Sequence, residues 1–271
     1  MDAGQAVGLL VIGLAAGVAS GMFGIGGGVI IVPALTLFLA FEPLNAIATS
    51  LAALLLPVGI LAVTTYYRAG LMRVRSAALV AAGLVLTVVI GAQIAINLPA
   101  NLLKQIYGVF LLYMGWRLAE PRQVYAEQRA QQPTGAAAPQ ADAPGAPVQE
   151  PNIPWYWLLL LGMAAGVASG MFGIGGGIII VPALVGLFKY DQKLAVGTSL
   201  GALLLPVGLP GVIAYYQAEA FDVAAAALVA LGLALGALAG ARIALNLPSR
   251  TVRRLYGLFL LAVALRFVFG G

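Results

Sequence analysis

Apolar residues run along most of this chain in stretches that glycine, proline or a few polar residues interrupt. Each half offers five such stretches, at about residues 5–20, 26–41, 46–66, 76–97 and 102–118, and at about 155–169, 175–188, 195–215, 223–246 and 251–268. A helix that crosses a bilayer needs about 20 residues, a length that the third and fourth stretches of each half reach. The first two stretches of each half are shorter. The pattern predicts an all-α polytopic membrane protein with about eight to ten transmembrane segments.

The second half of the chain repeats the first. An offset of 149 residues aligns them without a gap, so that Ser20 falls on Ser169 and Pro33 on Pro182. The sequence therefore predicts an N-terminal transmembrane repeat over residues 1–118 and a C-terminal one over 155–271. Residues 119–154 between them are rich in Pro, Ala, Gln and Gly and hold too little apolar surface to fold. They are expected to form a disordered linker.

A glycine-rich segment interrupts the apolar pattern at the same place in each repeat. Residues 17–33 and 166–182 are identical except that Val29 is replaced by Ile178. Glycines at this density break a helix and leave backbone groups without partners, which a membrane protein tolerates only where they are buried in protein or line a polar cavity. Two breaks at matching positions point to a transporter's binding site near the bilayer midplane. The broken helices either cross the membrane or re-enter it.

The breaks suggest how a ligand is held. A helix that restarts after the glycines presents free N–H groups and the positive end of its dipole, which together favour a small anion. The predicted substrate-binding residues are these glycines and nearby hydroxyls, with one intramembrane cation: Ser20, Gly24, Gly26, Gly27, Gly28, Thr49, Ser50, Ser169, Gly173, Gly175, Gly176, Gly177, Thr198, Ser199 and Arg242. Arg242 alternatively snorkels from its helix end. Gly13, Gly17, Gly162 and Gly166 are predicted to serve helix packing instead.

Composition narrows the function classes. The chain of 271 residues is 62% hydrophobic and 8% charged and contains no cysteine or histidine. Nucleic-acid binding is not expected, and a membrane enzyme would lack a general base or a metal cluster. No cofactor or metal site is predicted. A coupling ion would be Na⁺ or H⁺, and because no apolar stretch contains Asp or Glu, sodium held by carbonyl and hydroxyl oxygens fits better than a carboxylate proton relay.

Charge predicts the topology. The loop between the third and fourth stretches holds Arg68, Arg73 and Arg75 in the first half, but Glu219 and Asp222 in the second. Because basic loops stay in the cytoplasm, the same loop must face opposite sides in the two halves, which requires an inverted repeat with an odd number of crossings per half. The linker is then cytoplasmic and both termini lie on the outer side of the cell (inner) membrane.

Two further features lead to smaller predictions. Pro57 and Pro206 are expected to kink their helices. The tyrosine pairs at residues 66–67 and 215–216 are expected to lie in the interfacial aromatic belt.

The doubled Gly-x-Phe-Gly-Ile-Gly-Gly-Gly-x4-Pro segment, at residues 21–33 and 170–182, resembles the signature of the TauE/SafE family of sulfite exporters, also called toluene sulfonate uptake permeases. The resemblance spans both halves and implies a secondary transporter of small, often sulfur-containing anions such as sulfite, sulfoacetate and other sulfonates. Members differ in substrate and direction, so the resemblance selects neither. The alternatives are an anion channel and a transporter of small carboxylates. The expected partners are the anion and the lipid bilayer, while the oligomeric state stays open.

Overall fold

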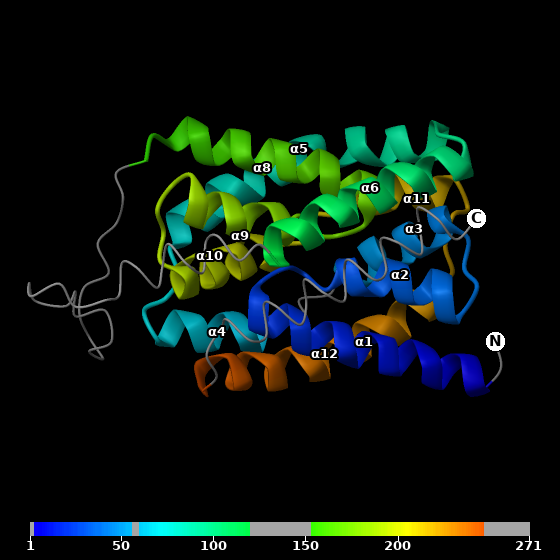
Figure 1. The fold of residues 1–271 in the computed structure, drawn as a ribbon, viewed down its shortest axis with the longest axis horizontal. Coiled ribbons are helices and arrows are strands. Elements are labelled where there is room, and N and C mark those ends of the chain that lie inside the picture. Colours follow the sequence, from blue (N-terminus) through cyan, green and yellow to red (C-terminus); the bar gives the residue numbers. More distant parts are fainter. Residues whose placement is uncertain (1–2, 56–59, 120–152, 247–271) are drawn as a thin grey trace, which may run out of the picture.

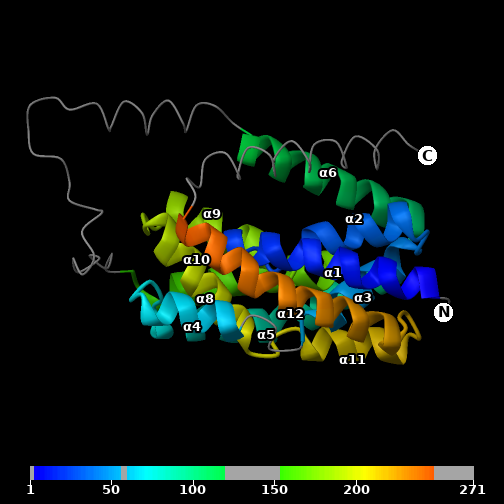
Figure 2. The same ribbon diagram turned by 90° about the horizontal axis from the view of Figure 1, so that it is seen from below.

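The computed structural model describes residues 3–55, 60–119 and 153–246, which hold α-helices and no β-strand. The helices of the first half are α1 (Ala3–Phe23), α2 (Gly28–Phe38), α3 (Pro43–Ala53), α4 (Ile60–Arg68), α5 (Val74–Asn97) and α6 (Ala100–Ala119). Those of the second half are α8 (Trp155–Phe172), α9 (Gly177–Gly186), α10 (Gln192–Leu204), α11 (Leu209–Gln217) and α12 (Val223–Asn246). Figure 1 shows them packed along one long axis, and Figure 2 shows α6 at one edge of the bundle. The expected all-α fold is confirmed.

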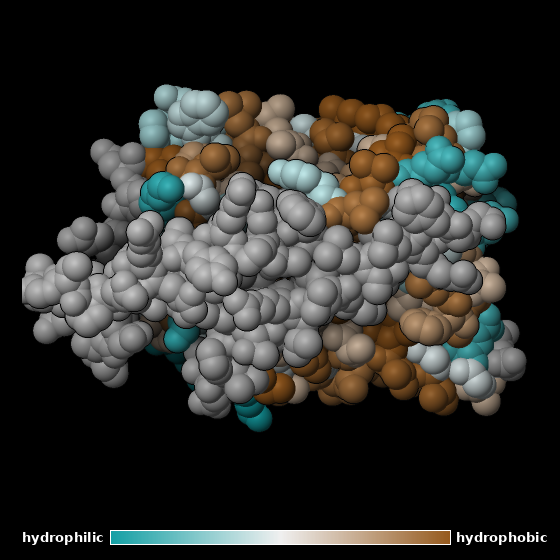
Figure 3. Space-filling view, viewed as in Figure 1, coloured by the Kyte–Doolittle hydropathy of each residue, from teal (hydrophilic) through white to brown (hydrophobic). Residues whose placement is uncertain are grey.

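Each half begins with a helix that stops at the glycine break and a shorter helix that turns back beside it, α1 with α2 and α8 with α9. The four helices α1, α5, α8 and α12 are long and apolar enough to cross a membrane, and the bent pair α10–α11 could form a fifth span among the described residues. Hydrophilic residues gather at the two ends of the long axis and hydrophobic ones between them, where grey atoms do not cover the surface (Figure 3). The protein is a multi-pass membrane protein.

The two halves are interlocked through their longest helices. The most extensive helix contacts join α1 to α12 and α5 to α8, so the first helix of each half packs on the fourth stretch of the other half. A Cβ atom added to Gly17 would overlap the carbonyl oxygen of Leu233, and one on Gly162 would overlap that of Val80. Close approach of this kind needs glycine. The prediction that Gly13, Gly17, Gly162 and Gly166 serve helix packing is confirmed.

Equivalent helices of the two halves run in opposite directions along the long axis. In Figure 1, α1 runs from the right end of the molecule toward the left and α8 runs from left to right, while α5 and α12 are opposed in the same way. The junctions α4–α5 and α9–α10 lie at one end of the bundle, and the junctions α2–α3 and α11–α12 at the other. Corresponding loops of the two halves are therefore at opposite ends.

Three expected helices differ in extent from those of the structure. The third stretch of each half was expected to form one crossing, but it is divided into α3 and α4, and into α10 and α11, which are bent by 49°. Leu205, before Pro206, is extended at φ −69° and ψ 151°, as a residue preceding proline favours. The kink at Pro206 is confirmed, and Pro57 lies outside the described residues. Conversely, α1 spans 21 residues and is not short, because its glycine face continues to pack on α12.

The tyrosine pairs are divided between two environments. Tyr67 and Tyr216 are 60% and 64% exposed, as belt residues would be. Tyr66 and Tyr215 are 2% and 0% exposed, so for them the prediction was wrong. The Tyr215 hydroxyl donates a hydrogen bond of 2.6 Å to the carbonyl oxygen of Gly170, which gives the buried phenol a partner inside the bundle.

Candidate substrate site

Both glycine segments are broken, as the sequence predicts. Between α1 and α2 the φ angles of Gly24, Gly26 and Gly27 are 69°, 82° and 81°, and between α8 and α9 those of Gly173, Gly175 and Gly176 are 65°, 71° and 85°. Only glycine adopts such angles without a steric penalty. The segments are buried in the protein. This environment is the one in which a membrane protein can keep a helix open.

The two breaks touch each other. A Cβ atom on Gly26 would lie 3.7 Å from the Cα atom of Gly175. A Cβ atom on Gly28 would overlap the carbonyl oxygen of Gly173, and one on Gly177 would overlap that of Gly24. Each helix start therefore lies directly against the opposite break, and a side chain in place of these glycines would separate them.

Each break is bonded to the other half of the chain by one buried serine. Ser50 in α3 donates a hydrogen bond of 2.7 Å to the carbonyl oxygen of Gly173. Ser199 in α10 donates one of 2.9 Å to the carbonyl oxygen of Gly24. Both serines are 0% exposed. The two bonds are reciprocal, because each half provides one serine donor and one glycine carbonyl acceptor at matching positions. They satisfy two of the carbonyl groups that the breaks leave without a helical partner.

Several amide groups at the breaks make no backbone hydrogen bond. The first such bonds after the two breaks are donated by Ile30 and Ile31 to Gly27, and by Ile179 and Ile180 to Gly176. Within the described part of the chain, no backbone bond is donated by residues 25–29 or 174–178. Residues 28–29 and 177–178 belong to the first turns of α2 and α9, which carry the positive ends of the helix dipoles, and the remaining amide groups lie in the breaks just before them.

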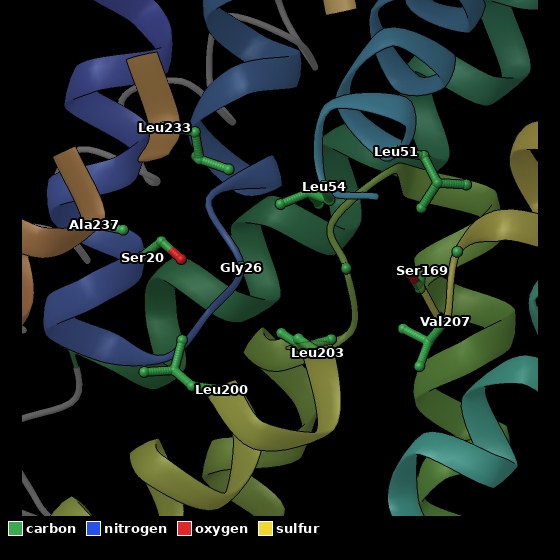
Figure 4. A pocket seen from close by; sticks show the side chains of 12 residues that line it. Ser20, Gly26, Leu51, Leu54, Ser169, Leu200, Leu203, Val207, Leu233 and Ala237 are labelled. Carbon is green, nitrogen blue, oxygen red and sulfur yellow. The ribbon is translucent and has the colours of Figure 1, made fainter. Parts of the chain in front are cut away.

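A cavity of about 40 Å³ lies where the breaks meet. It is lined by matching residues of both halves together with residues of α12 and of the α10–α11 junction: Ser20, Gly26, Leu51, Leu54, Ser169, Gly175, Leu200, Leu203, Val207, Gly208, Leu233 and Ala237. Ser20 and Ser169 approach it from opposite sides (Figure 4). They are 6% and 1% exposed, and neither hydroxyl makes a hydrogen bond among the described residues. Each is thus a buried polar group open toward the cavity.

The predicted site residues occupy three kinds of position. Ser20, Gly26, Ser169 and Gly175 line the cavity. Behind this lining, the other glycines and the two fastening serines build the breaks: Gly24, Gly27, Gly28, Ser50, Gly173, Gly176, Gly177 and Ser199. Thr49, Thr198 and Arg242 lie elsewhere.

The two threonines and the arginine are placed as follows. Thr198 accepts a hydrogen bond of 3.2 Å from the backbone N–H of Arg73, whereas the Thr49 hydroxyl is buried without a partner in the described part of the chain. Arg242 is exposed on α12 and is not part of the cavity lining. We therefore leave these three residues out of the candidate substrate site. No group of three His, Cys, Asp or Glu that could hold a metal ion occurs among the residues that the structure describes.

The hydrophobic walls of the cavity were missed by the sequence reasoning. Leu51 in α3 and Leu54, just after the end of α3, match Leu200 and Leu203 in α10, and all four line the cavity. These leucines repeat at the 149-residue offset, one and four residues after each Thr-Ser pair, and this repeat was a usable signal. An aromatic cluster was also missed: the ring of Phe172, just before the second break, stacks on Phe110 of α6 at 4.6 Å and lies 5.6 Å from Tyr107.

Comparison with known proteins gives a consistent assignment. The family model described as "Sulfite exporter TauE/SafE" matches residues 9–267. A probable membrane transporter protein of Bacillus subtilis, YunE, is 25% identical over 274 residues, covering 97% of each chain. One of Methanocaldococcus jannaschii is 28% identical over 216 residues, 78% of this chain and 72% of that protein. One of Xylella fastidiosa is 32% identical over 106 residues, 37% of this chain and 39% of that protein. No solved structure matches the chain.

Proposed function

Since the chain belongs to the TauE/SafE family and is a membrane transporter and not an enzyme, we propose that it is a secondary transporter of a small sulfur-containing anion, such as sulfite or a sulfonate. The observation that carries this proposal is the cavity between the two breaks, which is lined by two buried hydroxyls that make no hydrogen bond among the described residues. The choice of a sulfur-containing anion follows the family's description as sulfite exporters.

The chemistry of the cavity favours an anion. Its polar edge consists of serine hydroxyls and of glycine backbone next to the starts of α2 and α9. Helix N-termini attract negative charge through their free N–H groups and their dipoles. None of the lining residues is acidic, so nothing in the lining repels an anion.

Alternating access is the transport mechanism that we propose. Matching helices run in opposite directions, as the two halves of an inverted repeat would, and the cavity lies where the halves meet. In such a repeat, one half can rock against the other around a fixed site and expose it first to one side and then to the other. A channel would need a continuous open path through the same site.

The proposed orientation places the linker in the cytoplasm and the termini outside the inner membrane. The junctions α4–α5 and α9–α10, which lie at one end (Figure 1), carry Arg68, Arg73, Lys189 and Lys193. Glu42 and Asp222 lie at the junctions of the opposite end. The positive-inside rule assigns the first end to the cytoplasm. A reporter fused to the C-terminus that is active only outside the cytoplasm tests this assignment.

Reconstituted protein provides the test of function. Vesicles loaded with unlabelled sulfite should accumulate labelled sulfite by counterflow, which a carrier shows and a channel does not. Ser20→Ala and Ser169→Ala should each raise KM roughly 10- to 100-fold, because a hydrogen bond to a charged group is worth about 1.5–3 kcal/mol.

Ser76→Ala is the matched control. Ser76 is 6% exposed, as is Ser20, but its hydroxyl pairs with that of Tyr190 at 2.9 Å and does not line the cavity. Its KM should therefore stay within about twofold. Wild-type vesicles with no saturable flux of sulfite, sulfonates or small carboxylates would refute the proposed function. Equal effects of all three substitutions would refute the location of the site.

A further inference from the structure

The positive charge that the cavity can present is limited. Its lining contains two serines, three glycines and seven apolar residues, and no lysine or arginine. Each helix dipole is equivalent to about half a positive charge at its N-terminus. The starts of α2 and α9 converge here because Gly26 and Gly175 touch. Together the two helix ends therefore offset about one negative charge.

Charged side chains do not add to the positive charge that the two helix ends present to the cavity. The charged residues on or next to the elements that line the cavity stand at the element ends and are exposed: Glu42 before α3, Asp191 and Lys193 at the start of α10, Glu219 and Asp222 between α11 and α12, and Arg242 near the end of α12. Arg73, just before α5, is half-buried and its backbone N–H bonds to Thr198 of α10, but it does not line the cavity. Charges in contact with solvent are strongly screened. The field inside the cavity is thus set by the breaks and the hydroxyls.

The hydroxyls of Ser20 and Ser169 are also suited to binding a singly charged anion. Both are buried, both lack a partner among the described residues, and both residues line the cavity (Figure 4). A hydroxyl can donate one hydrogen bond and accept others, so one serine can donate to an anionic oxygen while the other accepts from an acidic O–H group. A sulfonate, which has no O–H group, can accept a hydrogen bond from each serine, so both kinds of singly charged anion can be bound by the two hydroxyls.

The cavity walls make a second charge costly. Five leucines are among the seven apolar residues of the lining: Leu51, Leu54, Leu200, Leu203 and Leu233. A charge moved from water into apolar surroundings is strongly unfavourable unless a partner compensates it, and a group in this situation takes up a proton instead. The volume of about 40 Å³ has room for roughly three or four water-sized groups, too few for a hydration shell to accompany the ligand.

We propose that the cavity accepts anions in their singly charged form, so that an oxyanion able to carry two charges is bound and carried only after it has taken up a proton. This inference rests on the proposed function and specifies the substrate of that same cavity. The proton travels on the substrate, from solution on one side to solution on the other. No acidic side chain of the protein has to relay it.

Two anions of nearly equal size and shape test the inference. Methanesulfonate carries one charge throughout the neutral range, whereas methylphosphonate acquires its second charge there. KM for total methylphosphonate, measured with the intact protein in vesicles, should rise about tenfold for each pH unit above its second pKa, because only the singly charged fraction binds. KM for methanesulfonate should stay within about twofold over the same range and reports any effect of pH on the protein itself. Sulfite should behave as methylphosphonate does, and sulfate should not compete.

The outcomes separate the two proposals. Saturable flux of methylphosphonate or sulfite with a KM that does not follow the singly charged fraction would overturn the inference and leave the proposed function intact. Competition by sulfate as strong as that by methanesulfonate would also overturn it. Absence of saturable flux for every anion would instead refute the proposed function on which the inference rests.

Discussion

Ser50 and its neighbour Thr49 provide a sharp test of how the breaks are held. Both are 0% exposed in α3, but the Ser50 hydroxyl donates to the Gly173 carbonyl oxygen at 2.7 Å, whereas the Thr49 hydroxyl has no partner within the described residues. Ser50→Ala leaves a buried carbonyl group without its donor, which costs about 1–3 kcal/mol. Thr49→Val keeps the shape of the side chain and removes a hydroxyl to which the described part of the chain offers no partner. It should be neutral or slightly stabilising.

The assay is thermal unfolding in detergent, followed by the fluorescence of the three tryptophans. For a chain of this size a change of 1 kcal/mol shifts the midpoint on the order of 2–4 °C, so Ser50→Ala should unfold several degrees below the wild type and below Thr49→Val. Ser199→Ala, which removes the reciprocal bond to Gly24, should behave as Ser50→Ala does. Equal midpoints for Ser50→Ala and Thr49→Val would refute the claim that these bonds hold the breaks.

Three further substitutions test the packing around the site by the same assay. Gly17→Ala places a Cβ atom on the Leu233 carbonyl and should cost about 1–3 kcal/mol, whereas Gly186→Ala, with nothing within 4 Å, should be neutral or stabilising by up to about 1 kcal/mol. Tyr215→Phe removes the 2.6 Å bond to Gly170 and should cost about 1 kcal/mol; Tyr66→Phe, at the matching position, should cost less. Thr198→Val removes the acceptor for Arg73 N–H and should destabilise by about 1 kcal/mol, in contrast to Thr49→Val.

The breaks could be predicted from sequence because their cause is local. Gly24, Gly26 and Gly27 need positive φ angles, and glycine is the residue that allows them at little cost. Each half also repeats the same glycines, so one pattern supports the other. The small-residue faces of α1 and α8 were predictable for a similar reason, since their spacing is a property of a single helix.

What sequence reasoning could not supply is which helix of one half meets which helix of the other. The contact of α1 with α12 depends on the tertiary structure and not on local sequence. Because of this contact, Leu233 lines the cavity and Arg242 does not. The division of the third stretch was missed because residues 195–215 are long and apolar enough for one span. Pro206 suggested only a kink, not the bend of 49° between α10 and α11. The roles of Ser50 and Ser199 also depend on the other half, because their acceptors are 123 and 175 residues away.

Because the serine bonds are reciprocal, the two breaks cannot move independently. Ser50 of the first half holds the break of the second, and Ser199 of the second half holds the break of the first. Any rocking of one half against the other therefore changes both bonds, and it displaces both helix starts from the cavity that they share. A buried polar group that loses its partner is costly, so intermediate positions in which both bonds are broken are disfavoured relative to positions in which one is kept. Under the proposed mechanism, this coupling favours discrete states of the halves and disfavours a continuously open path through the site.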